Sequence, residues 1–148
     1  VIALTINLSF AQSVRTEVEI FQETIGLEKK VAVADFMALD ENAGNFWKIY
    51  DEYEAKRKKL GLERIKIVAD YALSYPNISD EEIEALFKRT NTFKKSFAKL
   101  QKTYFKRMKK EVGSTEAAQF WQLETYFNSI IQTEIYARIP FIGENLED

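Results

Sequence analysis

The sequence predicts an all-α fold: a long antiparallel helical hairpin, preceded by a short helix and followed by a C-terminal helix that packs back on the hairpin. Three observations support this prediction. The 148 residues include only two prolines and five glycines, too few for a β fold with many turns. Apolar residues recur at helical spacing over three long stretches. Short turn signals separate these stretches at the points where the helical spacing stops.

The first residues are apolar and uncharged, reading VIALTINLSFA over 1–11. Their length, and the small residues Ser9 and Ala11 before Gln12, are typical of a signal-peptide core and its cleavage site. We therefore expect residues 1–11 to be a signal-peptide remnant and the protein to be periplasmic or otherwise exported. The alternative is an ordinary buried N-terminal helix or strand. No other stretch approaches the roughly 20 apolar residues of a membrane span, so the chain is not expected to span a membrane.

Residues 12–38 form an acidic N-terminal segment that should contain short helices, the first ending at Gly26. Residues 39–148 form the helical hairpin domain. Its first long helix should begin with Asp40 as N-cap and run to about Ser74. Gly61 lies inside this helix, where glycine costs about 1 kcal/mol relative to alanine.

The second long helix begins at the clearest local signal in the chain. Pro76 disfavours helix at the residue before it, and Ser79 with Glu82 forms a capping box. Apolar residues from Ile83 to Met108 make one face of this helix. Gly113 is expected to close it in the left-handed conformation.

The last helix should begin with Ser114 as its N-cap and stop before Pro140. Charged residues interrupt its apolar face, which a helix that only fills a core has no reason to carry. Glu124 needs a partner from another helix, and the arginines on the apolar face of the first long helix are the expected donors. We predict a structural polar network of five residues: Arg57, Arg64, Glu124, Glu134 and Arg138.

The same charges allow an alternative interpretation as an acid/base site built on Glu124, Glu134 and Arg64. However, the sequence contains neither cysteine nor histidine, which removes thiolate chemistry, the usual general base and the commonest ligands of transition metals. No nucleophile motif or phosphate loop accompanies the carboxylates. We therefore expect no enzymatic activity, no cofactor and no metal.

A block of positive charge lies on the second long helix. Between Ala85 and Lys110 there are ten lysines or arginines and no acidic residue. The simpler interpretation is a solvated face, but these like charges repel one another, and that cost suggests that the face binds a partner. A pI near 5.4 and the lack of a reading motif argue against nucleic acid. We expect this basic face to bind an anionic or unfolded protein partner through Lys88, Lys95, Lys99, Lys102, Lys106, Lys109 and Lys110.

Aromatic residues are also more numerous than a thin hairpin can bury. Phe46, Trp47, Tyr50 and Tyr53 fall close together on the first long helix. Most such stripes are core. The surplus here predicts that some aromatic surface is exposed, for a client or for a second copy in a homodimer.

The starts of the two long helices, LDENA at 39–43 and ISDEE at 78–82, resemble the Leu-Thr-x-x-Gln motifs of small exported Spy/CpxP-like proteins. The second is the closer match, with Ser for Thr and Glu for Gln; the first departs at both positions. The stretches at 117–124 and 137–140 resemble segments of uncharacterised exported helical proteins.

This resemblance implies a periplasmic, ATP-independent chaperone or stress-sensor accessory, often a dimer. We therefore expect a non-enzymatic binding protein that holds unfolded or anionic partners. The alternative is a structural or regulatory protein that docks one dedicated envelope partner. Metal sensing in that family relies on His or Met ligands, and this chain has no histidine and two methionines, so metal sensing is not expected.

Overall fold

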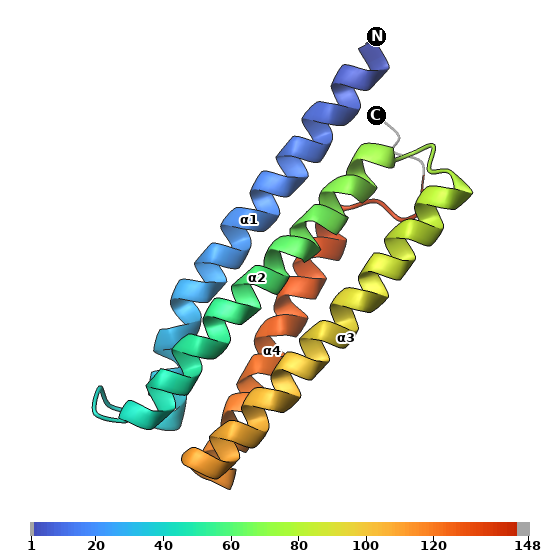
Figure 1. Ribbon diagram of the computed structural model, residues 1–148. Coiled ribbons are helices and arrows are strands. Elements are labelled where there is room, and N and C mark those ends of the chain that lie inside the picture. The colour runs from blue at the N-terminus through green and yellow to red at the C-terminus, as the bar shows by residue number, and fades with distance from the viewer. Residues whose placement is uncertain (1, 145–148) are drawn as a thin grey trace.

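The computed structural model describes the backbone of residues 2–144 and the side chains of residues 8–144. Val1, which begins the expected signal-peptide remnant, and residues 145–148, which end the expected hairpin domain, lie outside the described residues. This part of the chain forms four helices: α1 (Ile2–Met37), α2 (Gly44–Ser74), α3 (Asp80–Glu111) and α4 (Ser114–Arg138). The helices run alternately in opposite directions. Each packs on the next, and α4 returns to α1, which closes a four-helix bundle (Figure 1). The predicted all-α class is confirmed.

α1 is one helix of 36 residues, so the predicted stop at Gly26 is wrong. An internal glycine costs only about 1 kcal/mol, which packing of α1 on α2 and α4 outweighs. A Cβ at Gly26 would lie 3.9 Å from Nη2 of Arg57, an ordinary van der Waals contact, so the packing of α2 does not require glycine there. The first turns of α1 project past the other helices (Figure 1). Within residues 2–144, no helix is both long and apolar enough to cross a membrane.

The loop between α1 and α2 corrects a second expectation, because Asp40 is not an N-cap. α2 begins at Gly44, and its N-cap residue Ala43 makes no side-chain bond. Asp40 instead shapes the loop. Its carboxylate accepts from the Asn42 backbone N–H at 2.9 Å, and its carbonyl accepts from Trp47 Nε1 at 2.8 Å.

The capping box at the start of α3 is confirmed: Glu82 N–H donates to Ser79 Oγ at 3.3 Å, and Ser79 N–H donates to Glu82 Oε2 at 2.8 Å. The next turn differs from the prediction. Gly113 is extended, with φ of 163°, and serves as the N-cap residue of α4 in place of Ser114. A Cβ there would meet the Glu116 carboxylate, so another residue at this position would require that flexible side chain to move. α4 ends before Pro140, as predicted.

A layer of buried polar residues divides the core into two apolar clusters. All four helices supply the cluster nearer the α1–α2 and α3–α4 loops, which we call the closed end. Its buried members are Val33, Met37, Phe46, Ile49, Tyr50, Tyr53, Tyr104, Met108, Ala117 and Phe120. The other cluster, at the open end, contains buried residues from α1, α2 and α4 but none from α3. Its members are Ala11, Val14, Val18, Ile65, Val68, Ala72, Ile131 and Ile135.

The first half of α3 accounts for this difference. No side chain between Asp80 and Thr92 is buried, and Phe93 is the first that is. α3 lies against α4 at the closed end and diverges from it toward the open end (Figure 1). Polar contacts with α2 hold this half in place: Arg89 bonds Glu63 at 3.0 Å and also pairs with Asp70. Such partly exposed pairs contribute roughly 0–1 kcal/mol each.

Candidate functional site

The polar layer is built around Lys29 of α1, which is 1% exposed. Its ammonium donates to Glu54 of α2 at 2.5 Å and to Glu124 of α4. Arg57, one turn beyond Glu54, donates to both oxygens of that carboxylate at 2.9 and 3.1 Å. Two cations and two carboxylates are thus arranged across three helices, which favours a role in fixing how α1, α2 and α4 pack.

The sequence interpretation placed Glu124 in this layer but assigned the wrong partner. Its ion-pair partner is Lys29, not Arg57 or Arg64. Lys29 was missed because α1 was expected to stop at Gly26; its partner Glu54, on α2, was missed as well. In an uninterrupted helix, Lys29 falls on the same face as the buried residues Val18 and Val33 of α1. Its helical spacing from these residues is the signal that could have identified it.

In the polar layer, burial and ion pairing shift the pKa values of the charged groups in opposite directions. Burial alone would raise the pKa of Glu54, but the charges of Lys29 and Arg57 outweigh it and hold that pKa below its ordinary value. Burial would lower the pKa of Arg57, and Glu54 reverses the effect and raises it. Burial, reinforced by nearby carboxylates, raises the pKa of the Tyr50 hydroxyl far above its ordinary value. Glu54 and Arg57 therefore stay charged at neutral pH, while the Tyr50 hydroxyl stays neutral.

Glu134 and Arg138, two members of the predicted network, pair with each other at i,i+4, but they lie at the α1–α4 edge and not in the core. The Arg138 side chain is 27% exposed. It also approaches Glu17 of α1 at 3.4 Å and lies 5.4 Å from the centre of the Phe21 ring. This pair fastens α4 to α1 and is separate from the polar layer.

Arg64 differs from every other buried charge, because no carboxylate in the described part of the chain pairs with it. Nη1 donates to Asn128 at 3.1 Å and Nη2 to Gln22 at 2.7 Å, both neutral amides. Nε has no acceptor. Gly61 gives Gln22 room, since a Cβ there would lie 3.2 Å from its Oε1 and would push the amide away by a few tenths of an ångström.

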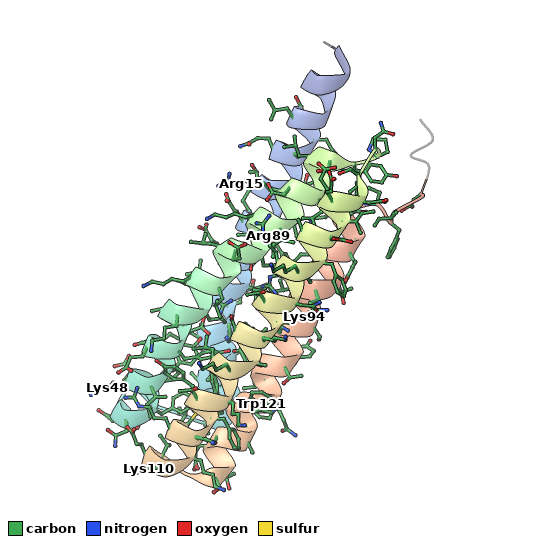
Figure 2. All side chains as sticks on the ribbon, turned by 45° about the vertical axis from the view of Figure 1, so that its right-hand side comes forward. Arg15, Lys48, Arg89, Lys94, Lys110 and Trp121 are labelled. Carbon is green, nitrogen blue, oxygen red and sulfur yellow. The ribbon has the colours of Figure 1, made fainter. Side chains whose placement is uncertain are left out.

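An apolar groove opens beside Arg64 at the open end, between α2, the first half of α3 and the end of α4. Its volume is about 370 Å³, within the usual range of ligand pockets. Phe87, Tyr136, Phe141 and Ile142 stand at its rim, each more than half exposed. Figure 2 shows Lys94, another lining residue, on α3. The apolar walls comprise Ile67, Val68, Tyr71, Ile78, Ile83, Leu86, Phe93, Ile135, Ile139 and Pro140.

The basic face lies on the solvent side of α3. All seven predicted lysines are exposed, and none forms an ion pair with the residues described here. The two arginines of the same helix behave differently: Arg89 pairs with Glu63 and Asp70, and Arg107 with Glu52 and Glu111. Arg89 and Lys110 lie toward opposite ends of α3 (Figure 2). Arginine thus connects α3 to α2, and lysine is left for solvent or a partner.

The carboxylates offer little room for a reaction. Glu124 is 3% exposed, and the cavity beside it holds about 10 Å³, no more than one water. Over residues 2–144, no three acidic side chains gather closely enough to hold a metal ion. The groove, not the carboxylate cluster, is therefore the best-formed candidate site.

Comparisons of the chain with protein-family models, with curated proteins and with solved structures found no match.

Proposed function

We propose that this chain is a non-enzymatic binding protein that holds apolar segments of unfolded polypeptides, as a chaperone does. One observation carries the proposal: side chains of α2, α3 and α4, and of the segments before α3 and after α4, line an apolar groove at the open end that no side chain of the described chain fills. Residues Phe87, Phe141 and Ile142 at its rim are 64–69% exposed. Contiguous apolar surface of this kind marks interaction sites in soluble proteins.

The way α3 is attached supports an adaptable site. Its first half is held by exposed polar contacts with α2, including Ser74 with Glu82 at 2.9 Å, and by no buried side chain. Elements with few buried apolar contacts open at low free energy. The groove can therefore widen for segments of different size, which a protein that receives many unfolded clients requires.

The test is light scattering of a chemically denatured model enzyme diluted into buffer, with and without equimolar protein. The wild type should suppress aggregation, and Phe87→Ser should suppress it several-fold less. Phe36→Ser is the matched control, because Phe36 is 58% exposed on α1, outside the groove. Equal suppression by both variants, or none by the wild type, would remove the groove from the mechanism.

The basic face favours a second candidate, a dedicated anionic partner in the cell envelope that docks on α3. Seven exposed lysines without acidic partners support it. A pull-down with the Lys95, Lys99, Lys102 and Lys106 to Gln variant should lose that partner. The charge-matched control replaces Lys48, Lys58, Lys59 and Lys66, which are exposed on α2. Retention by both variants would exclude the basic face.

Export and homodimer formation belong to the same proposal. The apolar sequence of residues 1–11 supports export, and the exposed groove rim supports association with a second copy. N-terminal sequencing of the protein from the envelope fraction should find Gln12 first. Sedimentation should give twice the chain mass of 17.2 kDa, and Phe87→Ser should reduce it. A chain that starts before Gln12 would contradict the proposed cleavage on export. A monomer at every concentration would contradict the proposed homodimer.

A further inference from the structure

Arg64 lies where the polar layer meets the apolar groove, and its charge is not balanced. It is 7% exposed, yet its acceptors are two neutral amide oxygens, those of Gln22 and Asn128. The two carboxylates of the layer are bonded to Lys29 and Arg57 instead. The buried layer therefore holds three cations and two anions. Burial of an uncompensated charge is costly, so the site is short of one anion.

The guanidinium keeps one donor, Nε, without an acceptor; Nε is itself buried, so a carboxylate reaches it only when neighbouring side chains shift. Arginine binds a carboxylate best with two parallel N–H groups, and Nε with Nη2 forms one such edge. On this edge Gln22 is the only acceptor, and Nε has none. Burial and the nearby charge of Arg57 lower the pKa of Arg64 to about 10, so the group is still cationic at neutral pH.

The surroundings of Arg64 specify what else the anion carries. Arg64 lines the groove, and its Cζ lies 5.5 Å from the centre of the Phe93 ring, which forms part of the wall. Beyond it the lining is mostly aliphatic and aromatic, with Thr90 and Gln132 as its uncharged polar members. Lys94 is exposed and lies among the lining residues. A ligand that matches these surroundings has one carboxylate beside Arg64 and an apolar body that extends toward the rim of the groove.

We propose that the groove binds a free aliphatic monocarboxylic acid, with its carboxylate against the Arg64 guanidinium and its hydrocarbon chain along the apolar walls. The inference shares the groove with the proposed function and rests on the groove being open. It does not require that the protein bind unfolded clients. A bound acid completes the charge balance of the polar layer and fills space that the first half of α3 leaves unpacked.

The test is calorimetric titration with decanoate below its self-association concentration, with 1-decanol as the uncharged control. Decanoate should bind at least tenfold more tightly than decanol. Arg64→Met should weaken decanoate by about 10- to 100-fold, as expected for hydrogen bonds to a charged group, and leave decanol unchanged. Lys94→Met, which removes an exposed charge beside the groove, should change decanoate affinity less than threefold.

A second measurement covers the case in which Arg64→Met does not fold. In wild-type protein carrying ¹⁵N-arginine, one Nε–H resonance should shift on addition of decanoate and not on addition of decanol. Equal affinity for the two compounds, or no such shift, would overturn the inference. Tighter binding at Arg64 of an apolar peptide with a free C-terminal carboxylate would also overturn it, because the occupant would then be a polypeptide. Decanoate binding without suppression of aggregation would refute only the chaperone proposal.

Discussion

The two ends of the bundle use the same residue types for different purposes. At the closed end Phe120 of α4 packs among aromatic rings of α2, with ring centres 6.0 Å from Phe46, 5.7 Å from Tyr50 and 5.4 Å from Tyr53. At the open end Phe87 of α3 has no aromatic ring against it among the described pairs and is 69% exposed. An aromatic residue on an amphipathic helix is core only where a fourth helix comes close enough to cover it.

The polar layer lies between the two ends and separates them. Paired charges are costly to bury, but breaking a pair is costlier, so such a layer disfavours helix arrangements that separate its partners. Here the layer fixes α1, α2 and α4 through Lys29, Glu54 and Glu124 and makes no ion pair with α3. α3 is therefore fixed by packing at the closed end and left free to diverge at the open end, where the groove forms.

The comparison is sharpest for two phenylalanines. Phe120→Ala should lower the free energy of unfolding by about 3–5 kcal/mol, the usual effect of a cavity left by phenylalanine in a core. Phe87→Ala should change it by less than about 0.5 kcal/mol, as at most exposed positions. Urea denaturation measures both. Similar losses at the two positions would mean that the open end is packed as tightly as the closed end.

Glu124→Ala tests the layer itself. It leaves the buried Lys29 with only Glu54, which Arg57 already shares, so unfolding should be easier by about 3–5 kcal/mol. Glu134→Ala is the control on the same helix; its pair with Arg138 is partly exposed, and the loss should stay below about 1 kcal/mol. A thermal midpoint for Glu124→Ala within about 2 °C of the wild type would contradict a network that holds the bundle together.

Tyr50→Phe should stabilise the closed end, with an effect that depends on pH. The Tyr50 hydroxyl is buried without a partner, so its removal should raise the free energy of unfolding by about 1 kcal/mol at neutral pH. Its pKa is raised in the folded protein, so above pH 10 the unfolded chain ionises first and the wild type loses stability. The advantage of the variant should therefore grow between about pH 10 and 11. Denaturant titrations at both pH values decide this, and a constant difference would refute it.

Much of this architecture could be predicted from the sequence because local signals coincide with tertiary packing. The capping box of Ser79 and Glu82, the stop at Pro140 and the inward position of Glu124 all follow from spacing on one helix. The extent of α1 could not be predicted in the same way. Gly26 is a common terminator, and only the contacts of α1 with two neighbouring helices outweigh its cost.

The site was less predictable than the fold. Ile83, Leu86 and Phe87 have the helical spacing of a core face, and the sequence assigned them to one; the structure leaves them lining a groove. Periodicity shows which face of a helix is apolar but not whether a neighbour covers it. For the same reason, the partners of Arg64 could not be predicted from the sequence. Its apolar-face position predicted burial, but the neutral amides of Gln22 and Asn128 come from two other helices.

The smallest effect is expected where α1 projects beyond the open end. A chain that begins at Gln12 loses Ala11, the one buried side chain among residues 8–11, while Val14 and Val18 keep the α1 part of that cluster. Because α3 contributes no buried residue there, α1 is one of only three helices that enclose this cluster. The shortened chain tests whether the first turns of α1 are needed to stabilise the cluster. The midpoint of thermal unfolding should fall by no more than about 4 °C, which corresponds to roughly 1 kcal/mol in a chain of this size. A larger fall, or loss of decanoate binding in the shortened chain, would mean that the projecting turns support the open end and the groove beside it.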